Sequence, residues 1–219
     1  MILPDSFTLR ELDKIIADDW FNGDVYPKAI EYLRDKNIKT AVDIGASSGS
    51  ISYFILSLIE PETLICFEPD ADNFALLESN MRPYNNVQVI NKAIFYGKDT
   101  VSVNGTGDNN FLGYMIADIH TDHTDFWEKL HPYEGKVFEC VELEAYTNGV
   151  DLIKMDVEGS EYNIIENSLA VYNSRYILLE THNHGMEYVV EYIKEHLQHR
   201  IVFSQGVGIH LGFLLEKQV

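Results

Sequence analysis

Segments typical of β-strands and segments typical of α-helices alternate along most of this chain, and that alternation is what most restricts its fold. Strands are predicted at residues 40–44, 63–67, 87–91, 150–155 and 175–179, and helices at 49–58, 71–81, 160–169 and 186–198. Two further strands, 201–204 and 209–215, are joined by a Gly-containing turn that is too short for a crossover, so they must pair antiparallel. The sequence therefore predicts an α/β fold with a seven-stranded, mostly parallel sheet, an antiparallel terminal strand and helices on both faces.

The 219 residues are expected to form a single domain with one large core. Residues 1–38 should contribute two N-terminal helices, the first capped by Ser6 or Thr8. Residues 39–95 would form a cofactor-binding half and residues 147–219 a C-terminal half.

Residues 96–146 interrupt the alternation with a stretch rich in Gly, Asn, Asp and His. A pure loop of this length would be abnormal in a compact domain, so we expect an insertion with structure of its own. Short strands are predicted at 100–103 and 136–143, and a helix near 124–130. Because the insertion follows the third strand at the ligand end of the sheet, it could shape a substrate pocket. A surface excursion without a functional role is an equal alternative.

Composition restricts the partners and the compartment. The formal net charge of −19 speaks against a nucleic-acid partner, because phosphates would be repelled and the 16 Lys and Arg residues form no basic stripe. No run approaches about 18 apolar residues, and the acidic N-terminus lacks the pattern of a signal peptide. Cys66 and Cys140 lie in apolar, strand-like stretches and are expected to be reduced thiols. We therefore expect a cytoplasmic protein without a membrane span.

The first predicted strand runs into V-D-I-G-A-S-S-G, which has the form of a ligand-binding loop. Gly45 allows a tight turn and Gly49 a close approach, with Ala46 and Ser47 between them. A phosphate-binding P-loop would need a lysine after its last glycine, and a dinucleotide loop would need two glycines where serines stand here. Asp43, a carboxylate before the first glycine, instead suits the cationic sulfonium and amino group of S-adenosylmethionine. The loop is therefore predicted to hold this cofactor, with its amide groups facing the ligand; a generic strand-to-helix turn is the alternative.

Polar residues also follow the second and third strands. Glu68 lies some 25 residues after Asp43 and is placed to accept hydrogen bonds from both ribose hydroxyls, and Pro69 ends its strand. Asn91 and Ala93 would lie where an adenine rests. Asn at a strand end is also a common turn former, which is the alternative for Asn91.

A lysine interrupts the apolar fourth strand. Lys154 should be buried there, so it needs a carboxylate partner. In the usual order of such a sheet the first, fourth and fifth strands are neighbours, which would bring Asp43, Asp156 and Glu180 together at the ligand edge. Asp156 is the leading candidate for a general base or substrate-orienting group. His182, just beyond the fifth strand, is its rival because histidine titrates near neutral pH.

Other polar residues near this centre have structural alternatives. His182 and His184 could belong to a solvated loop. Glu158 and Glu161 flank Gly159 at a helix start, where acidic groups favour the helix dipole. Glu161 could also turn toward the cofactor, and its role stays open.

The motifs V-D-I-G-A-S-S-G, F-E-P-D and D-L-I-K-M-D-V-E-G-S-E together resemble the FkbM family of S-adenosylmethionine-dependent methyltransferases. Residues 151–161 are similar to the family's hallmark, I-K-x-D-V-E-G-x-E, and the resemblance runs from about Lys39 to Glu180. Ser47 and Glu144 depart from it, since the family more often has Asn and Asp at these positions. The resemblance implies a Rossmann-like class I methyltransferase fold. It also implies methyl transfer to a hydroxyl of a small molecule or saccharide.

Two other functions stay open. One is a nicotinamide-dependent oxidoreductase on a similar sheet, against which the missing second glycine and Asp43 speak. The other is a module that binds the cofactor without catalysis, which the presence of Lys154, Asp156 and Glu180 makes less attractive.

Histidines and carboxylates recur in the insertion as A-D-I-H-T-D-H-T-D. His120 and His123 could bind a metal with Asp118 or Asp122, but no Cys or H-E-x-x-H pattern accompanies them. A cation at the reaction-centre carboxylates is a second minor alternative. No metal is therefore expected.

Overall fold

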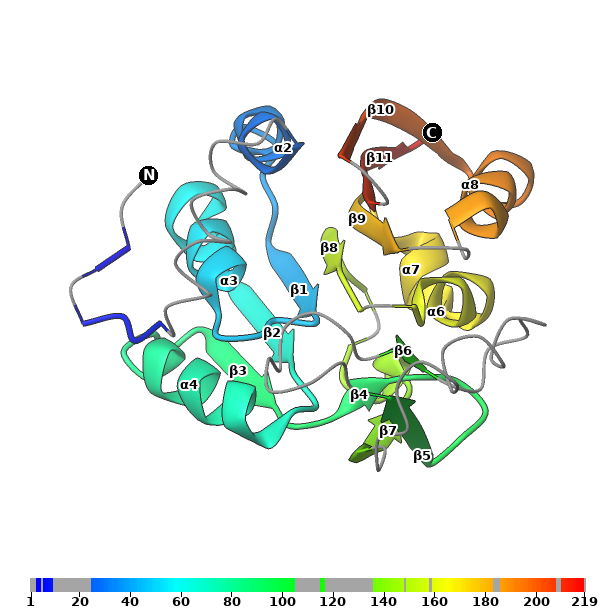
Figure 1. The fold of residues 1–219 in the computed structure, drawn as a ribbon. Coiled ribbons are helices and arrows are strands. Elements are labelled where there is room, and N and C mark those ends of the chain that lie inside the picture. Colours follow the sequence, from blue (N-terminus) through cyan, green and yellow to red (C-terminus); the bar gives the residue numbers. More distant parts are fainter. Residues whose placement is uncertain are drawn as a thin grey trace.

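A computed structural model describes residues 3–4, 6–9, 25–104, 115–116, 136–147, 149–157, 159–182, 186–207 and 210–218. Its main sheet has seven strands in the order β10-β11-β9-β8-β1-β2-β3 (Figure 1). The strands are β1 (Thr40–Ile44), β2 (Thr63–Phe67), β3 (Val87–Ile90), β8 (Leu152–Met155), β9 (Tyr176–His182), β10 (His199–Val207) and β11 (His210–Lys217). β11 pairs antiparallel with both β9 and β10, and the remaining pairs are parallel. The predicted sheet is confirmed, including the neighbouring positions of β1, β8 and β9.

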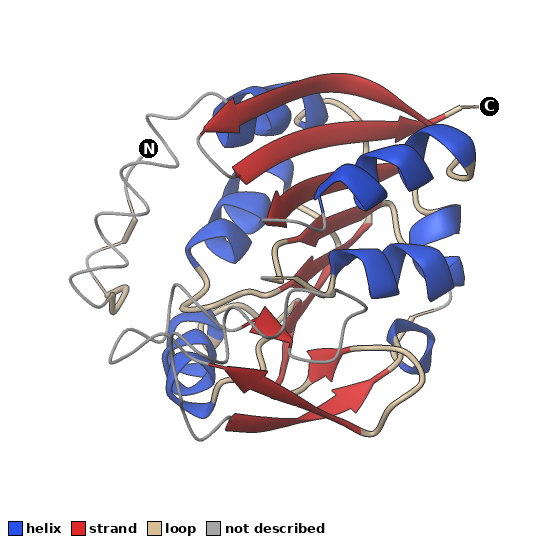
Figure 2. Cartoon of the chain, turned by 45° about the vertical axis from the view of Figure 1, so that its right-hand side comes forward, coloured by secondary structure: helices blue, strands red, loops and turns tan. Residues whose placement is uncertain are grey.

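Helices cover both faces of this sheet (Figures 1 and 2). One face carries α2 (Val25–Leu33), α3 (Ser50–Phe54), its π-helical continuation η1 (Ile55–Ile59) and α4 (Ala71–Met81). The other face carries α6 (Glu161–Asn167), α7 (Leu169–Asn173) and α8 (Met186–Glu195). A separate cluster of buried side chains lies under each set of helices. In the described part of the chain, no helix combines the length and apolar character needed to cross a membrane.

The central strands send alternate side chains into the two cores, because successive side chains of a strand point to opposite faces. In β1, Val42 and Ile44 join the core beneath α6 and α8, whereas Ala41 joins the core beneath α2 and α3. Asp43 has the same parity as Ala41 and therefore points toward α2 and α3. Lys154 is its register partner in β8 and points the same way. Two ionisable side chains thus lie inside an otherwise apolar layer.

Two helices differ from their predicted form. The helix predicted over 49–58 continues to Ile59, but its second half is π-helical. The helix predicted over 160–169 is divided, because Ser168 adopts an extended conformation and ends α6. The hydroxyl of Ser168 then caps α7 by accepting the amide of Val171 at 3.1 Å. The first N-terminal helix, expected from Ser6 onward, lies mostly outside the described residues.

The insertion, together with the short strand that precedes it, builds a second, four-stranded sheet in the order β4-β7-β5-β6 (Figure 1). Its strands are β4 (Ala93–Ile94), β5 (Thr100–Asn104), β6 (Met115–Ile116) and β7 (Lys136–Val141). The two strands predicted in the insertion are confirmed, although β7 ends before a 3₁₀ turn, η2 (Leu143–Ala145), rather than at residue 143. The helix predicted near 124–130 lies outside the described residues.

Candidate active site

An ion pair between adjacent strands forms the centre of the site. The Nζ atom of Lys154 lies 3.1 Å from Oδ1 of Asp43 and 3.8 Å from Oδ2 of Asp156. It also donates a hydrogen bond of 2.7 Å to the backbone carbonyl of Gly45. The hydroxyl of Ser52, in α3, donates a hydrogen bond of 2.6 Å to Oδ2 of Asp43. The carboxylate partner expected for a buried lysine is therefore present.

Burial opposes the charge on both members of this ion pair. Burial raises the pKa of the Asp43 carboxyl, while the Lys154 ammonium and the Ser52 hydroxyl act in the opposite direction. For Lys154, burial favours the neutral form, but the charges of Asp43, Asp156 and Glu180 outweigh it and raise the pKa. Lys154 is thus held as a cation. Three carboxyl groups surround one ammonium, so the formal charge of this centre is negative.

Glu180 extends the centre at the carboxyl end of β9, where α2 reaches it. The hydroxyl of Tyr26 donates a hydrogen bond of 3.1 Å to Oε2 of Glu180. Tyr26 is 5% exposed, and its burial, followed by the charges of Glu180 and Asp156, raises its pKa well above the ordinary value. The phenol therefore remains a protonated donor. Sequence reasoning does not identify Tyr26, because its only signal is a place in the first turn of an amphipathic helix.

Three residues with positive φ shape the loop after β1. The φ angles are 78° at Gly45, 51° at Ser47 and 91° at Gly49. A Cβ atom on Gly45 would lie 1.8 Å from the backbone oxygen of Asp156, and one on Gly49 would lie 2.9 Å from two side chains of α4. Glycine is favoured at both positions because its backbone reaches positive φ without cost, and at Gly45 no side chain fits against the backbone of Asp156. The loop is therefore packed directly against the end of β8.

Four amide groups of this loop, which were predicted to face a ligand, donate hydrogen bonds within the protein. The amides of Gly45 and Ala46 both donate to the carbonyl of Phe67, and the amide of Gly49 donates to the carbonyl of Ala46. The amide of Ser47 donates to a carboxylate that follows β2. Phosphate-binding loops hold their ligand with free amides, so these contacts argue against a phosphate site. The hydroxyl of Ser47 is buried and has no hydrogen-bond partner among the described residues.

The carboxylate that holds the loop belongs to Glu68, which is 6% exposed. It accepts hydrogen bonds from the amides of Ser47 at 2.8 Å and Asp70 at 2.9 Å, and from the side-chain amide of Asn73 at 3.3 Å. Burial outweighs these donors and raises the pKa of Glu68 to about 7. A carboxylate has about four lone-pair sites, so the protein already uses most of them. Ribose binding by Glu68 stays a prediction, and this geometry favours one hydroxyl contact rather than two.

The side chain of Asn91 holds the turn after β2. Its amide donates to the backbone carbonyls of Glu68 at 2.8 Å and Pro69 at 3.0 Å. This is the turn-forming role that the sequence left open for Asn91. Ala93 lies in β4, where it pairs with Cys140 of β7. Contacts of Asn91 and Ala93 with an adenine stay predictions.

Some predicted residues lie elsewhere or outside the described part. His182 is the last residue of β9 and pairs with β11, so it lies within the strand rather than beyond it. The side chain of His182, the residues Glu158 and His184, and the histidines and carboxylates of residues 118–123 are outside the described part. Glu161 begins α6 and is 3% exposed. Among the side chains described, no three or more His, Cys, Asp or Glu residues are grouped so as to hold a metal.

The hallmark segment, residues 151–161, spans the sheet from one edge to the other. Asp151, at the amino edge, accepts the backbone amides of Lys39 at 2.8 Å and Thr40 at 3.1 Å. It also pairs with the guanidinium of Arg175 at 3.0 Å. Asp156 lies at the opposite edge, beside Lys154. The first aspartate of the segment therefore ties strands together, and only the second reaches the candidate site.

The second sheet contacts the main domain on both sides of the site, through an ion pair on one side and hydrogen bonds on the other. Lys136, at the start of β7, pairs with Asp70, whose carboxylate also caps α4. Tyr96 exchanges hydrogen bonds with the side chain of Asn163 in α6, its amide donating at 2.9 Å and its carbonyl accepting at 3.3 Å. The hydroxyl of Tyr96 donates to Glu144. The described strands of the insertion therefore have a fixed place next to the carboxyl edge of the sheet.

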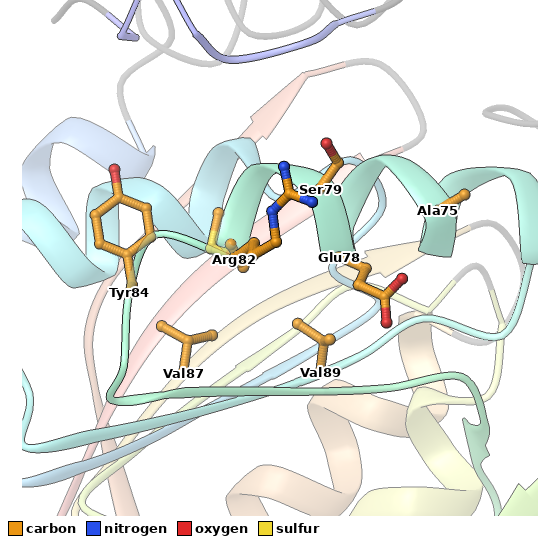
Figure 3. A pocket seen from close by; sticks show the side chains of 8 residues that line it. Ala75, Glu78, Ser79, Arg82, Tyr84, Val87 and Val89 are labelled. Carbon is orange, nitrogen blue, oxygen red and sulfur yellow. The ribbon is translucent and has the colours of Figure 1, made fainter.

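A groove of about 330 Å³ lies away from this centre, between α4 and β3 (Figure 3). It is lined by Ala75, Glu78, Ser79, Met81, Arg82, Tyr84, Val87 and Val89. None of these residues belongs to the predicted site, and β3 is the outermost strand on that side of the sheet. The geometry at the strand ends, not this groove, therefore defines the candidate site.

Sequence comparison places the chain among known methyltransferases. The model of the methyltransferase FkbM domain matches residues 43–203, which is well over half of the chain. The curated 2-O-methyltransferase NoeI of Sinorhizobium fredii (strain NBRC 101917 / NGR234) is 29% identical over 150 residues. That match covers 63% of this chain and 60% of NoeI, so the chain spans less than two thirds of this relative.

Several solved structures with the same fold are methyltransferases. The ribosomal protein L11 methylase from Lactobacillus delbrueckii subsp. bulgaricus has a TM-score of 0.55 at 11% identity, over 89% of this chain and 78% of that one. The B. subtilis M1A22 tRNA methyltransferase TrmK has a TM-score of 0.52 at 10% identity, over 89% and 65%. M. capricolum TrmK in complex with S-adenosyl-homocysteine has a TM-score of 0.50 at 7% identity, over 88% and 67%.

These structural likenesses show the fold alone, and they confirm the predicted Rossmann-like methyltransferase architecture. The family match covers the end of β1 from Asp43, the loop that follows it, and the hallmark segment, which together contribute Asp43, Lys154 and Asp156. The match favours a methyltransferase over the oxidoreductase alternative. This chain belongs to the FkbM methyltransferase family.

Proposed function

We propose that this chain is an S-adenosylmethionine-dependent methyltransferase that acts on a hydroxyl of a saccharide or another small molecule. The observation that carries the proposal is the buried ion pair of Asp43 and Lys154, with the half-buried Asp156 and Glu180 beside it, near the carboxyl ends of β1, β8 and β9. Ligands of such sheets bind beyond the carboxyl ends of the strands. A sulfonium cofactor complements the negative formal charge there, whereas a phosphate-bearing cofactor would be repelled.

The loop after β1 fits the same cofactor. Its amides are bound to the protein itself, so it offers little to a phosphate, while the buried hydroxyl of Ser47 can still bond to a ligand. Glu68 keeps room for a hydroxyl of the ribose, and M. capricolum TrmK, of the same fold, binds the cofactor product. The residues proposed to line the cofactor site are Asp43, Gly45, Ala46, Ser47, Gly49, Glu68, Pro69, Asn91, Ala93 and Asp156.

S-adenosylmethionine, when bound, would supply a methyl group on a sulfonium that is already activated for in-line displacement. The chain must then align the acceptor hydroxyl and accept its proton. Asp156 is our candidate for this role, because its side chain is 10% exposed at the sheet edge whereas Asp43 is fully buried. Lys154 holds the carboxylate of Asp156 and ties it to the carbonyl of Gly45. His182 remains the rival base.

A neutral, hydroxylated acceptor fits this site best. An acidic centre in a chain of net charge −19 repels phosphates, which weighs against RNA although a tRNA methyltransferase shares the fold. The name of NoeI, a 2-O-methyltransferase, supports a hydroxyl as the methyl acceptor. The second sheet, fixed beside the carboxyl edge, is the proposed wall of the acceptor pocket.

Calorimetry and methyl-transfer assays test the two parts of this proposal separately. Titration with S-adenosylmethionine and S-adenosylhomocysteine should give binding heat for both. Labelled methyl groups should then pass to members of a panel of mono- and oligosaccharides and small alcohols. Absence of binding heat for both compounds would refute the cofactor, and transfer to RNA with none to the panel would refute the acceptor class.

Two aspartates of the hallmark segment provide a matched test of the mechanism. Asp156→Asn should lower turnover by about 10²–10⁴-fold, the usual contribution of general acid–base catalysis. Its affinity for S-adenosylhomocysteine should stay nearly unchanged, because that ligand lacks the sulfonium charge. Asp151→Asn, at the opposite edge of the sheet, should lower stability but leave turnover per folded molecule unchanged. Normal turnover by Asp156→Asn would remove Asp156 from the mechanism.

A further inference from the structure

The helix α2 lies outside the segment that matches the family, since that match begins at residue 43. This helix packs across the face of the sheet that holds Asp43 and Lys154 (Figure 1). Its first turn lies at the carboxyl edge, where Tyr26 bonds to Glu180. Its other end lies at the amino edge, where the hydroxyl of Tyr32 donates at 3.0 Å to Glu216 in β11. One helix thus carries two Tyr–Glu hydrogen bonds, of which only one touches the candidate site.

We propose that Tyr26 is a positioning residue of the reaction centre, holding the carboxylate of Glu180 in place and in its ionised form through a partly buried hydrogen bond. The inference rests on the proposed function, because it requires the sulfonium cofactor to bind at this edge of the sheet. It adds to that function a residue from outside the family segment.

Crowding of like charges makes a donor to Glu180 necessary. Glu180 lies near Asp156 and Asp43, and all three carboxyl groups act on the same ammonium, that of Lys154. Lys154 is in direct contact with Asp43 and Asp156 and also bonds to a backbone carbonyl. Like charges at close range disfavour ionisation, and a hydrogen bond donated to the charged form restores it.

Tyr26 is suited to this role because its donor is permanent. Its side chain is buried in the core beneath α2 and α3, and this burial and the nearby carboxylates keep the phenol protonated. A phenol has no charge of its own, so it supplies a donor without neutralising the negative centre. Glu180 can therefore remain ionised and add to the potential that favours a cationic sulfonium over an uncharged sulfur.

The selectivity between S-adenosylmethionine and S-adenosylhomocysteine reports on this charge without any methyl acceptor. We would measure the ratio of the two dissociation constants by calorimetry on the full chain, from acidic to neutral pH. The preference for S-adenosylmethionine should weaken as pH falls and the carboxylates become protonated. In Tyr26→Phe the midpoint of this loss should move to higher pH by about one unit, the size expected when a hydrogen bond to a charged group is removed.

Two further variants make the result specific. Tyr32→Phe removes the matched hydroxyl on the same helix and should leave the midpoint in place. Glu180→Gln should lower the preference at neutral pH, and Tyr26→Phe should then have no additional effect, because coupled residues are not additive. Asp43, Lys154 and Asp156 are all retained in Glu180→Gln, so that variant separates their contribution from that of Glu180.

The outcomes distinguish the inference from the function on which it rests. If the wild-type chain binds S-adenosylmethionine but Tyr26→Phe leaves the midpoint unmoved, or Tyr32→Phe moves it equally, the role of Tyr26 is refuted and the cofactor is retained. If the wild-type chain binds neither compound, the proposed function fails and the inference fails with it. Partial unfolding of Tyr26→Phe would lower the binding stoichiometry but would not by itself move the midpoint, so the midpoint still tests the role of Tyr26 in a less stable variant.

Discussion

Replacing Gly45 with alanine should destabilise the protein far more than the same replacement at Gly97. Their φ angles are +78° and +84°, so both substitutions carry the cost of a left-handed backbone, about 1–2 kcal/mol. A Cβ atom on Gly97 meets nothing within 4 Å, whereas one on Gly45 would lie 1.8 Å from the backbone oxygen of Asp156. Gly97 therefore measures the backbone cost alone, and the difference between the variants measures the contact between the loop and β8.

The size of the stability difference between the two variants depends on which part of the backbone must move to relieve the clash at Gly45. The clash can be relieved only by separating the loop from the end of β8, where the amide of Asp156 donates to the carbonyl of Ile44 at 3.1 Å. Overpacking typically costs about 1–3 kcal/mol, and the cost rises when the neighbour is backbone. We expect roughly 3–5 kcal/mol for Gly45→Ala. For Gly97→Ala we expect about 1 kcal/mol or less, because alanine also reduces the entropy of the unfolded chain.

Urea denaturation followed by circular dichroism measures both free energies of unfolding. In a chain of this size each 1 kcal/mol corresponds to roughly 2–4 °C, so Gly45→Ala should melt on the order of 10 °C below the wild type. Equal losses in the two variants would show that the loop has room beside Asp156 and would refute the reasoning. Gly45→Ala should also bind S-adenosylhomocysteine more weakly, because the displaced loop carries Ser47.

Three other changes test the charges around the site. Lys154→Met should cost about 3–5 kcal/mol in urea denaturation by leaving the buried Asp43 unpaired, and Asp43→Asn should recover part of this loss in the double variant. The pKa of Glu68 is raised from 4.5 to about 7, so its protonated form favours folding below pH 4.5 and that stability is lost as pH rises through about 7. The free energy of unfolding should fall by about 3 kcal/mol over this range, and Glu68→Gln should flatten the profile. Lys136→Met should change stability by less than about 1 kcal/mol, since 44% of the lysine side chain is exposed; a larger loss would mean that its pair with Asp70 is needed for folding.

The strand and helix pattern could be predicted because its signals are local. The predicted bounds of 40–44, 63–67 and 71–81 are those of β1, β2 and α4. The two strands are apolar runs that end before Gly45 and Glu68, and the helix begins after its cap, Asp70. The usual strand order of such a sheet also predicted that Asp43, Asp156 and Glu180 lie on or just after neighbouring strands, as they do.

The partners of the site residues could not be predicted, because they come from elements distant in sequence. Tyr26 and Glu180 are 154 residues apart, and Ser52 meets Asp43 only because α3 folds back over β1. The periodicity of apolar residues predicts helices and strands, but it does not predict which polar side chains will form such long-range hydrogen bonds. The division of the predicted helix 160–169 into α6 and α7 likewise depends on the Ser168 side chain, which caps α7, rather than on a break in the apolar pattern.

The loop after β1 shows why a motif and its contacts must be considered separately. Its sequence excludes phosphate-binding patterns by the residues it lacks, and its structure supports the same conclusion through amides that are already bound. Once those amides are occupied, the loop can contribute to ligand binding mainly through the Ser47 hydroxyl and through the carboxylates it positions. Gly45 is the link between these roles, since its carbonyl accepts from Lys154 while its missing side chain makes room for Asp156. The glycine of the motif thus serves the charged centre as directly as it serves the turn.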